Sequence, residues 1–495
     1  MMPTKAENYP IIYVRGYAMT PGEISDTVET PYMGFERGGT KVRQTWDQKV
    51  IRHYFESPII RLMKDYGYRD VYSDGRVIEG QIPEKSIVIY RYYDSADADF
   101  GTGQVPSIAE AARGLLELIK NIRQQVCSTG AIKLSDFKVH LVAHSMGGLI
   151  VRAFLQNDSI TTRAERELVD KVFTYATPHN GIDMAGFNVP SSFGLWDMSN
   201  FNRKVMAEYL GLPPNSARVD TLDGKFPVER FFCLVGTNHR DYPTAAGFSR
   251  RLAGEMSDGL VRIENATVQG APRAFVFRSH SGPYGIVNSE EGYQNLVRFL
   301  FGNVRIDGSL VVEAVPLPPS VKKEKDQGKE IRGSYYFEST VAPRGATTYR
   351  LTERRRDTFS AILREYDDLM KPPLAQKPRS PLLFSTFLDT EKITEGKAIV
   401  FAIDLQVSST GYTIENIVYK QHIEGEYLYR NTITVKATPQ LGGGFDVHYV
   451  FTDENWSEGF GTKAITSADG RQFIIKIMTP KGFKADLHLN ASMFA

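Results

Sequence analysis

The run from Val139 to Val151 constrains this chain most, because an apolar stretch passes through a turn of small residues into a second apolar stretch. Ser145 stands on that turn, with Ala143 two positions before it and Gly147 two positions after it. A serine on a sharp strand-to-helix turn adopts strained backbone torsions, and only small side chains fit at those flanking positions. The sequence therefore predicts an exposed serine hydroxyl at the positive end of a helix.

A serine that merely caps a helix is the alternative interpretation, since serine is a favoured N-cap residue. His144 and the pair Gly147-Gly148 make the pattern more specific than that. With them, the stretch resembles the Ala-His-Ser-Met-Gly-Gly elbow of bacterial triacylglycerol lipases and of GPI-inositol-deacylase-like α/β-hydrolases. The resemblance covers roughly residues 10–303. It implies an α/β-hydrolase fold, a serine nucleophile at Ser145 and cleavage of carboxylic esters.

Residues 10 to about 303 alternate short apolar runs with helical periodicity, which predicts parallel β/α construction with a sheet buried on both faces. A capping box at Ser107 and Glu110 predicts the start of one amphipathic helix, and a second helix is expected around residues 293–300. The expected strands are Pro10–Val14, Ser86–Tyr93, Lys138–Ala143, Lys171–Ala176, Arg230–Gly236 and Ala274–Arg278.

Beyond this region the pattern changes, so we expect a catalytic domain over 1–305, a linker over 306–330 and a mostly β, sandwich-like domain over 331–495. Proline-rich Val315–Pro319 and the charged run Val321–Lys329 indicate the linker. In the C-terminal domain, strand-like alternation occurs at Gly333–Val341, Lys397–Ser408, Tyr427–Ala437 and Gln472–Met478. One helix is expected at Asp357–Met370.

An activated serine needs a base, and the base needs an orienting carboxylate. His280 is the expected base because it follows the last predicted strand of the catalytic domain and precedes its last helix, and His239 is the weaker competitor. Asp258 is the expected acid, since Ser257–Val261 resembles the Asp-Gly-x-Val segment that carries the acid in these lipases. Asp241 is the alternative acid, and Asp258 could also be a solvated turn residue.

The oxyanion is expected to be stabilised by the backbone amides of Met146 and Tyr17. Tyr17 follows the first core strand, where this chain has Arg15-Gly16 instead of the His-Gly usual in the family. The changed side chain leaves Arg15 free to meet an anionic substrate or to form a structural ion pair, of which the ion pair is preferred. Tyr175–Gly181 resembles the Thr-Pro-His-x-Gly segment that follows the elbow, which implies that His179 shapes the floor of the site.

An insertion at about residues 182–228 is rich in apolar residues, which would be costly on a surface. It is expected either to cover the site as a lid or acyl pocket, or to pack against the second domain. Val205, Tyr209 and Leu212 indicate a short helix within it. The other apolar residues of the insertion are Phe187, Val189, Phe193, Leu195, Trp196, Met198 and Phe201.

The chain of 495 residues carries 59 lysine and arginine against 58 acidic residues, a net charge of +1. Such a balance gives no basic field for nucleic acid. Its two cysteines, Cys127 and Cys233, are expected as buried free thiols. No apolar run reaches the ~18 residues of a transmembrane span, and the N-terminus lacks the apolar core of a signal peptide. Cytoplasmic residence is the default expectation, and signal-less export is its alternative.

The sequence thus predicts a lipase or esterase acting on hydrophobic acyl esters, with Ser145, Asp258 and His280 as its triad and without a metal or other cofactor. The expected partners are a lipid or small ester and, transiently, a lipid surface. An acyltransferase, thioesterase or amidase with the same triad is the first rival hypothesis. The second is a catalytically silent scaffold whose C-terminal domain binds a protein partner.

Overall fold

In the computed structural model the chain divides into two compact units. The first, here called the α/β unit, comprises Glu7–Arg273 and Arg278–Leu300, and the second, the β unit, comprises Met1–Ala6, Ala274–Phe277 and Phe301–Ala495. The structure describes residues 8–16, 28–30, 32–44, 48–73, 76–77, 80–97, 101–184, 187–188, 198–240, 254, 256–282, 285–344, 350–353, 361–370, 380–390, 398–415, 420–440, 444–454 and 461–494.

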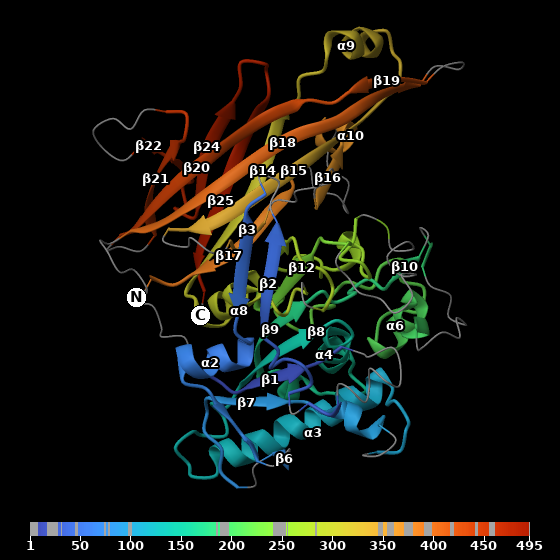
Figure 1. Cartoon of the computed structure of the whole chain (residues 1–495), viewed down its shortest axis with the longest axis vertical. Helices are drawn as coiled ribbons and strands as arrows, with labels where there is room; N and C mark the ends of the chain where they lie inside the picture. Colours follow the sequence, from blue (N-terminus) through green and yellow to red (C-terminus); the bar gives the residue numbers. More distant parts are fainter. Residues whose placement is uncertain are drawn as a thin grey trace. The chain divides into compact units, whose positions relative to one another are not determined.

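A seven-stranded sheet has the order β13-β12-β9-β8-β1-β7-β4, and its six strands from β12 to β4 form the core of the α/β unit (Figure 1). The five pairings from β12 to β4 are parallel. Strands β1 and β8 are central neighbours, so the segments that follow their carboxyl ends meet at one edge of the sheet. The strands are β1 (Ile11–Val14), β4 (Arg69–Asp70), β7 (Ser86–Ile89), β8 (Val139–His144), β9 (Val169–Tyr175), β12 (Phe231–Gly236) and β13 (Arg273–Val276).

Most residues of these strands are fully buried, as near-continuous apolar runs of a parallel sheet require. Helices α3 and α4 pack on one face of the sheet, and α2 and α8 lie against each other on the opposite face (Figure 1). The helices are α2 (Pro58–Tyr66), α3 (Ile108–Cys127), α4 (Gly147–Gln156), α5 (Arg163–Arg166), α6 (Arg203–Tyr209) and α8 (Glu290–Phe301). Short 3-10 turns are η1 (Tyr92–Ser95), η2 (Met198–Phe201), η3 (Val228–Arg230) and η4 (Ile263–Asn265).

Helix α3 shows how local sequence sets these boundaries. The Ser107 hydroxyl accepts from the Glu110 amide at 3.2 Å, and the Glu110 carboxylate accepts from the Ser107 amide at 2.8 Å, so the predicted capping box is present. The expected strand Ser86–Tyr93 is shorter than predicted, because β7 ends at Ile89 and Tyr92–Ser95 form a 3-10 turn.

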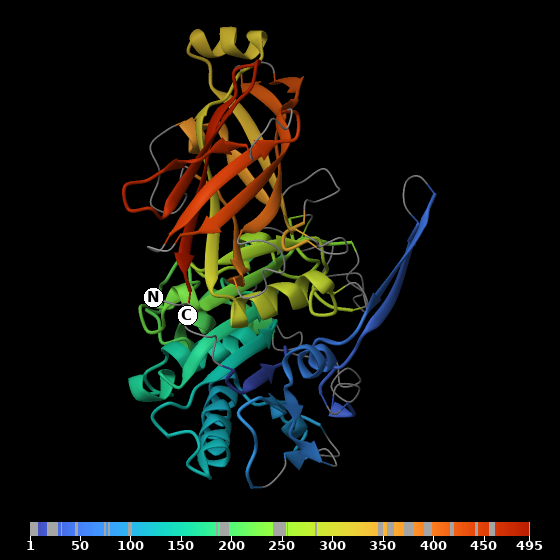
Figure 2. The same cartoon turned by 90° about the vertical axis from the view of Figure 1, so that its left-hand side faces the viewer.

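Three two-stranded ribbons were not predicted from the sequence. They are β2 (Gly39–Gln44) with β3 (Val50–Phe55), β5 (Tyr72–Ser73) with β6 (Arg76–Val77), and β10 (Asp183–Met184) with β11 (Phe187–Asn188). In the view of Figure 2 the β2–β3 ribbon extends well beyond the sheet and helices of its unit.

The β unit consists of two antiparallel sheets, ordered β17-β14-β25-β24-β23 and β16-β15-β18-β20-β21-β22, with β19 pairing to β18. Apolar residues from both sheets, among them Ile306 and Ile403, form one core. This agrees with the predicted β-rich C-terminal region. The strands are β14 (Val304–Ala314), β15 (Ile331–Pro343), β16 (Ile362–Glu365), β17 (Leu382–Leu388), β18 (Ile399–Glu415), β19 (Lys420–Glu424), β20 (Tyr427–Pro439), β21 (Phe445–Phe451), β22 (Thr462–Lys463), β23 (Ile465–Thr466), β24 (Gln472–Met478) and β25 (Lys484–Met493).

Two expectations for this half of the chain are wrong. Residues 306–330 are not a linker, because they contain most of β14 and the helix α9 (Pro319–Asp326). The alternating burial along β14 supplies the reason, since its inward residues complete the core. The predicted helix Asp357–Met370 is wrong at Ile362–Glu365, which pair with β15 as a strand. Only Tyr366–Met370 are helical, as α10. Residues 354–360 lie outside the described residues.

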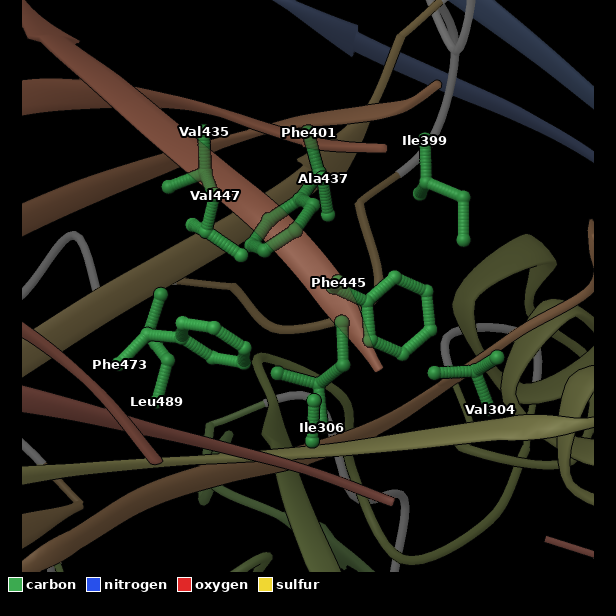
Figure 3. A pocket seen from close by; sticks show the side chains of 11 residues that line it. Val304, Ile306, Ile399, Phe401, Val435, Ala437, Phe445, Val447, Phe473 and Leu489 are labelled. Carbon is green, nitrogen blue, oxygen red and sulfur yellow. The ribbon is translucent and has the colours of Figure 1, made fainter. Parts of the chain in front are cut away.

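A small apolar cavity lies between the two sheets of the β unit, with its lining side chains drawn in Figure 3. Its volume is about 20 Å³, room for little more than one water molecule. Since an acyl chain needs far more space, this cavity is a packing defect of the core and not a ligand site. It is lined by Val304, Ile306, Ile399, Phe401, Val435, Ala437, Phe445, Val447, Phe473, Leu489 and Ala491.

Candidate active site

Ser145 occupies the turn between β8 and α4 with a positive φ of 54°, a region that side chains other than glycine rarely adopt. Its neighbours explain how the turn fits. A Cβ at Gly147 would collide with the carbonyl of Val14 on the adjacent strand, and a Cβ at Gly148 would collide with Thr177. The strained torsion is held by hydrogen bonds, from the Ser145 amide to Tyr175 O at 2.9 Å and from Thr177 Oγ1 to Ser145 O at 2.9 Å. The elbow geometry predicted from the sequence is therefore present.

The side chains of Ser145, His280 and Asp258 lie in one hydrogen-bonded line. His280 Nε2 is 2.9 Å from Ser145 Oγ, and His280 Nδ1 is 2.9 Å from Asp258 Oδ2. All three are buried, with relative exposures of 7%, 3% and 1%, so Ser145 is less exposed than the sequence predicted. An ionised carboxylate only accepts hydrogen bonds, so it favours the tautomer with the proton on Nδ1 and leaves Nε2 to accept from the serine hydroxyl.

The backbone fixes Asp258 in place. Its Oδ1 accepts from the amides of Leu260 at 3.0 Å and Val261 at 2.8 Å, while Oδ2 faces the imidazole. The amide of His280 donates to the Asp258 carbonyl at 2.9 Å, which ties together the two loops that carry acid and base. The Asp-Gly turn is thus not solvated. Each carboxylate oxygen has a separate task.

His144, the residue before the serine, contacts the base from a second side. Its Nε2 lies 2.9 Å from the backbone carbonyl of His280, and the two ring centroids are 5.1 Å apart. Because a carbonyl only accepts, His144 must be protonated on Nε2 to donate this bond. Burial, followed by the neighbouring His280, lowers the pKa of His144 well below its usual value, so the neutral ring is favoured. His144 therefore positions the loop that carries His280.

Met146 is the N-cap of α4, so its amide belongs to the first turn, where N–H groups have no intrahelical acceptor. The other predicted oxyanion donor, Tyr17, lies outside the described residues. Gly16, immediately before it, passes directly against the nucleophile. A Cβ there would collide with Ser145 Cβ and lie 3.1 Å from Ser145 Oγ. The chain at position 16 thus has to be glycine to reach the serine, which the sequence alone did not reveal.

The Arg15 side chain contacts residues 33–34. One of its guanidinium nitrogens donates to the carbonyl of Met33, and the group lies against Gly34. Burial lowers the pKa of Arg15. The Tyr92 hydroxyl donates to the Arg15 carbonyl at 2.8 Å. These contacts tie the segment after β1 to residues 32–36 and to the turn after β7.

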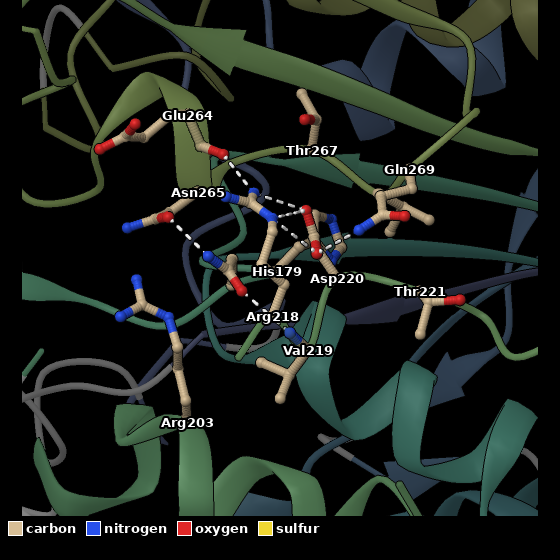
Figure 4. Close-up of polar contacts among 12 residues, drawn as sticks. His179, Arg203, Arg218, Val219, Asp220, Thr221, Glu264, Asn265, Thr267 and Gln269 are labelled. Carbon is tan, nitrogen blue, oxygen red and sulfur yellow. Dashed lines mark hydrogen bonds and ion pairs between the residues drawn. The ribbon is translucent and has the colours of Figure 1, made fainter. Parts of the chain in front are cut away.

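A polar network connects the insertion to the loops on either side of the site (Figure 4). The side chain of Asn180 accepts from the Val219 amide at 2.9 Å and donates to Asn265 at 2.9 Å. Next to it, Arg218 and Gln269 both donate to the buried carboxylate of Asp220, at 2.7 Å and 3.0 Å. The end of the insertion is thereby joined to the loop after β9 and to the segment that follows Asp258.

Arg152 lies on helix α4, which follows the nucleophile, and its side chain contacts the same end of the insertion. Its guanidinium is completely buried and donates to the carbonyls of His179 at 2.7 Å, Val219 at 2.5 Å and Thr221 at 2.7 Å. Burial lowers its pKa to about 10, so the group remains charged at neutral pH. Backbone carbonyls supply the compensation that a buried cation needs.

The remaining candidate residues predicted from the sequence are His179, His239 and Asp241. His179 is fully buried, contacts Thr174 Oγ1 at 3.1 Å and packs edge-on against Phe231, which gives it a structural position. His239 makes no hydrogen bond to Ser145 within the described residues. Asp241, the alternative acid, lies outside them.

The insertion is described at 182–184, 187–188 and 198–228. The predicted short helix is α6, Arg203–Tyr209, and the apolar Phe201, Tyr209 and Leu212 are buried. Val189, Phe193, Leu195 and Trp196, on which the lid interpretation also rested, lie outside the described residues.

Both cysteines are free, Cys233 buried and Cys127 half-buried. In the described ranges, no group of three or more His, Cys, Asp and Glu side chains has the arrangement of a metal site. Over the same ranges, every helix is too short or too polar to cross a membrane.

No family model and no curated protein matches the chain. Solved structures that resemble it include phospholipase PlaB from Legionella pneumophila, with a TM-score of 0.34 and 14% identity over 80% of this chain and 86% of that one. A metagenomic carboxyl esterase, MGS0156, has a TM-score of 0.29 and 13% identity over 56% and 65%. A putative cell surface hydrolase from Lactobacillus plantarum WCFS1 has a TM-score of 0.24 and 14% identity over 59% and 89%. These neighbours are hydrolases, but at such low scores the likeness does not establish a common family.

Proposed function

We propose that this chain is a serine hydrolase of the α/β-hydrolase class that cleaves carboxylic esters of hydrophobic acyl groups. The observation that carries the proposal is the relay from Ser145 Oγ through His280 to Asp258, with both hydrogen bonds at 2.9 Å, on a strained strand-to-helix turn. A serine cap of an ordinary helix needs neither the strain nor the buried histidine and carboxylate.

In the proposed reaction, His280 Nε2 removes the hydroxyl proton as Ser145 Oγ attacks the ester carbonyl. Asp258 stabilises the imidazolium that forms, and the amides of Met146 and Tyr17 stabilise the oxyanion. Collapse of the tetrahedral intermediate breaks the bond to the alkoxy oxygen, which takes the proton from His280. A water molecule, deprotonated by the same histidine, then attacks the acyl-enzyme. Collapse of this second intermediate breaks the bond to Ser145 Oγ, which takes the proton back from His280, and releases the carboxylic acid.

Support for a hydrophobic acyl group comes from the insertion, whose apolar residues are numerous in sequence and whose root is joined to the nucleophile helix through Arg152. An apolar insertion anchored to the helix that follows the activated serine suits a long or branched acyl chain.

The direct test is labelling with a fluorophosphonate probe, which phosphonylates an activated serine. We expect the wild-type protein to be labelled, Ser145→Ala to lose the label, and Ser135→Ala, on an exposed loop, to retain it. An unlabelled wild-type protein would overturn the proposal in favour of a silent scaffold. Hydrolysis of nitrophenyl esters of increasing chain length, beside the matching thioester and anilide, then measures acyl preference and separates an esterase from a thioesterase or amidase.

A further inference from the structure

The β2–β3 ribbon, defined as β2 (Gly39–Gln44) and β3 (Val50–Phe55), is a separate two-stranded sheet within the α/β unit. Its register runs from Gly39 opposite Phe55 to Gln44 opposite Val50, and in the described part of the chain no third strand pairs with it. Figure 2 shows it extending away from the body of its unit. A lone two-stranded ribbon is only marginally stable in water, so a projecting one gains from a surface on which to lie.

The ribbon exposes large apolar side chains. Val42 is 51% exposed and Val50 is 62% exposed. Because Gln44 pairs with Val50 and alternate residues of a strand share a face, Val42, Gln44 and Val50 lie on the same face. A single exposed valine is ordinary, whereas two on one face of a projecting ribbon form an apolar contact surface.

The same segment is strongly basic. Residues 39–55 include Lys41, Arg43, Lys49 and Arg52 but only one acid, Asp47, although the whole chain has a net charge of +1. Basic and apolar residues together match the interface of a membrane with anionic headgroups, which attracts lysine and arginine and accepts apolar side chains. Two copies of the ribbon would instead bring like charges together, which disfavours self-association through this surface.

We propose that the β2–β3 ribbon docks the protein onto anionic lipid surfaces. The proposal rests on the proposed function in one respect: docking would bring the active site to esters held in such a surface. The binding itself depends on the ribbon alone and can be measured in a protein that has no activity.

The experiment uses full-length Ser145→Ala, so that vesicles are not hydrolysed, and measures co-sedimentation with phosphatidylcholine vesicles containing no or 30% phosphatidylglycerol. We expect binding to the anionic vesicles only, weakened at high salt. Lys49→Gln with Arg52→Gln, of which Arg52 pairs with Val42 and so shares its face, should lower the partition constant roughly 25-fold, about fivefold for each charge. Val42→Asn with Val50→Asn should lower it about tenfold.

The matched control is Lys322→Gln with Lys323→Gln, two exposed lysines on α9, which should bind like the parent protein. Trp46, in the segment that joins β2 to β3, provides a second readout. With Trp196→Phe and Trp456→Phe, its fluorescence should shift to the blue on addition of anionic vesicles.

Equal binding to both kinds of vesicle, or ribbon variants that bind like the control, would overturn the proposal. A dimer in solution that the valine substitutions dissociate would also overturn it, and would assign the surface to a second copy of the chain. On a soluble short-chain nitrophenyl ester, the ribbon substitutions in the wild-type background should leave hydrolysis unchanged. Because the vesicle assay uses Ser145→Ala, a failure of the catalytic proposal would not affect its outcome.

Discussion

The substitution Asp258→Asn tests the proposed relay most sharply, because the structure dictates how the new amide must lie. In the native chain Oδ1 accepts from the amides of Leu260 and Val261, and Oδ2 faces His280 Nδ1. An asparagine has one acceptor oxygen, and two backbone donors compete for it. Its NH₂ group is therefore forced toward the imidazole.

An NH₂ group at that position can only donate, so Nδ1 of His280 must become the acceptor and its proton must move to Nε2. In that tautomer the histidine donates toward Ser145 Oγ and cannot remove its proton. Where this exchange has been made in a serine triad, kcat falls roughly 10⁴-fold. That factor corresponds to about 5.4 kcal/mol of lost transition-state stabilisation.

The assay is steady-state hydrolysis of a nitrophenyl ester by the wild type, Asp258→Asn and Asp241→Asn. We expect kcat to fall about 10⁴-fold for Asp258→Asn with KM and Tm nearly unchanged, since the two backbone hydrogen bonds persist. Asp241→Asn should behave like the wild type. If Asp258→Asn retained more than a tenth of kcat, or if Asp241→Asn lost as much, the assignment of the acid would be wrong.

Other predictions concern residues around the relay. His144→Ala should lower kcat about five- to tenfold, the worth of one hydrogen bond, while His144→Gln, whose amide can donate to the His280 carbonyl, should recover part of it; equal kcat values for the two variants would argue against positioning. Gly16→Ala should reduce fluorophosphonate labelling of Ser145 at least 100-fold, because the added methyl collides with the nucleophile; labelling at the wild-type rate would contradict the close approach. Burial lowers the pKa values of His144 and His179 in the folded protein, so each binds a proton only on unfolding. The free energy of unfolding should therefore fall as pH drops below about 6.5, by about 1.4 kcal/mol per pH unit for each histidine, and urea titrations at pH 7, 6 and 5 measure this slope. In His179→Gln the change in the free energy of unfolding per pH unit should be smaller than in the wild type. An equal change would contradict the assignment of part of this pH dependence to His179.

The local patterns of the sequence predicted much of the fold. Continuous apolar runs produced the buried parallel strands, and the capping box at Ser107 produced the start of α3. Prediction failed where local and tertiary preferences disagree. Ile362 and Leu363 fit the apolar face of a helix in the sequence. In the structure they pair with β15 instead, so their backbone groups form hydrogen bonds to a neighbouring strand and not within a helix. The prolines and charged residues around 315–329 led us to predict a linker over 306–330. The strand β14 in this range is recognisable only from the alternating burial of its residues in the core.

For the candidate site, the sequence by itself determined the nucleophile turn and the residue types of the relay, because small residues around Ser145 and the pair Asp258-Gly259 are local requirements of backbone geometry. Only the tertiary structure decided which donors and acceptors meet. The contact of His144 with His280 spans 136 positions, and the reach of Arg152 to Val219 spans 67. Such contacts produce no periodic pattern in the sequence, because hydrogen bonds between distant segments depend on how the whole chain folds. The requirement for glycine at position 16 became visible for the same reason, when β1 was placed beside β8.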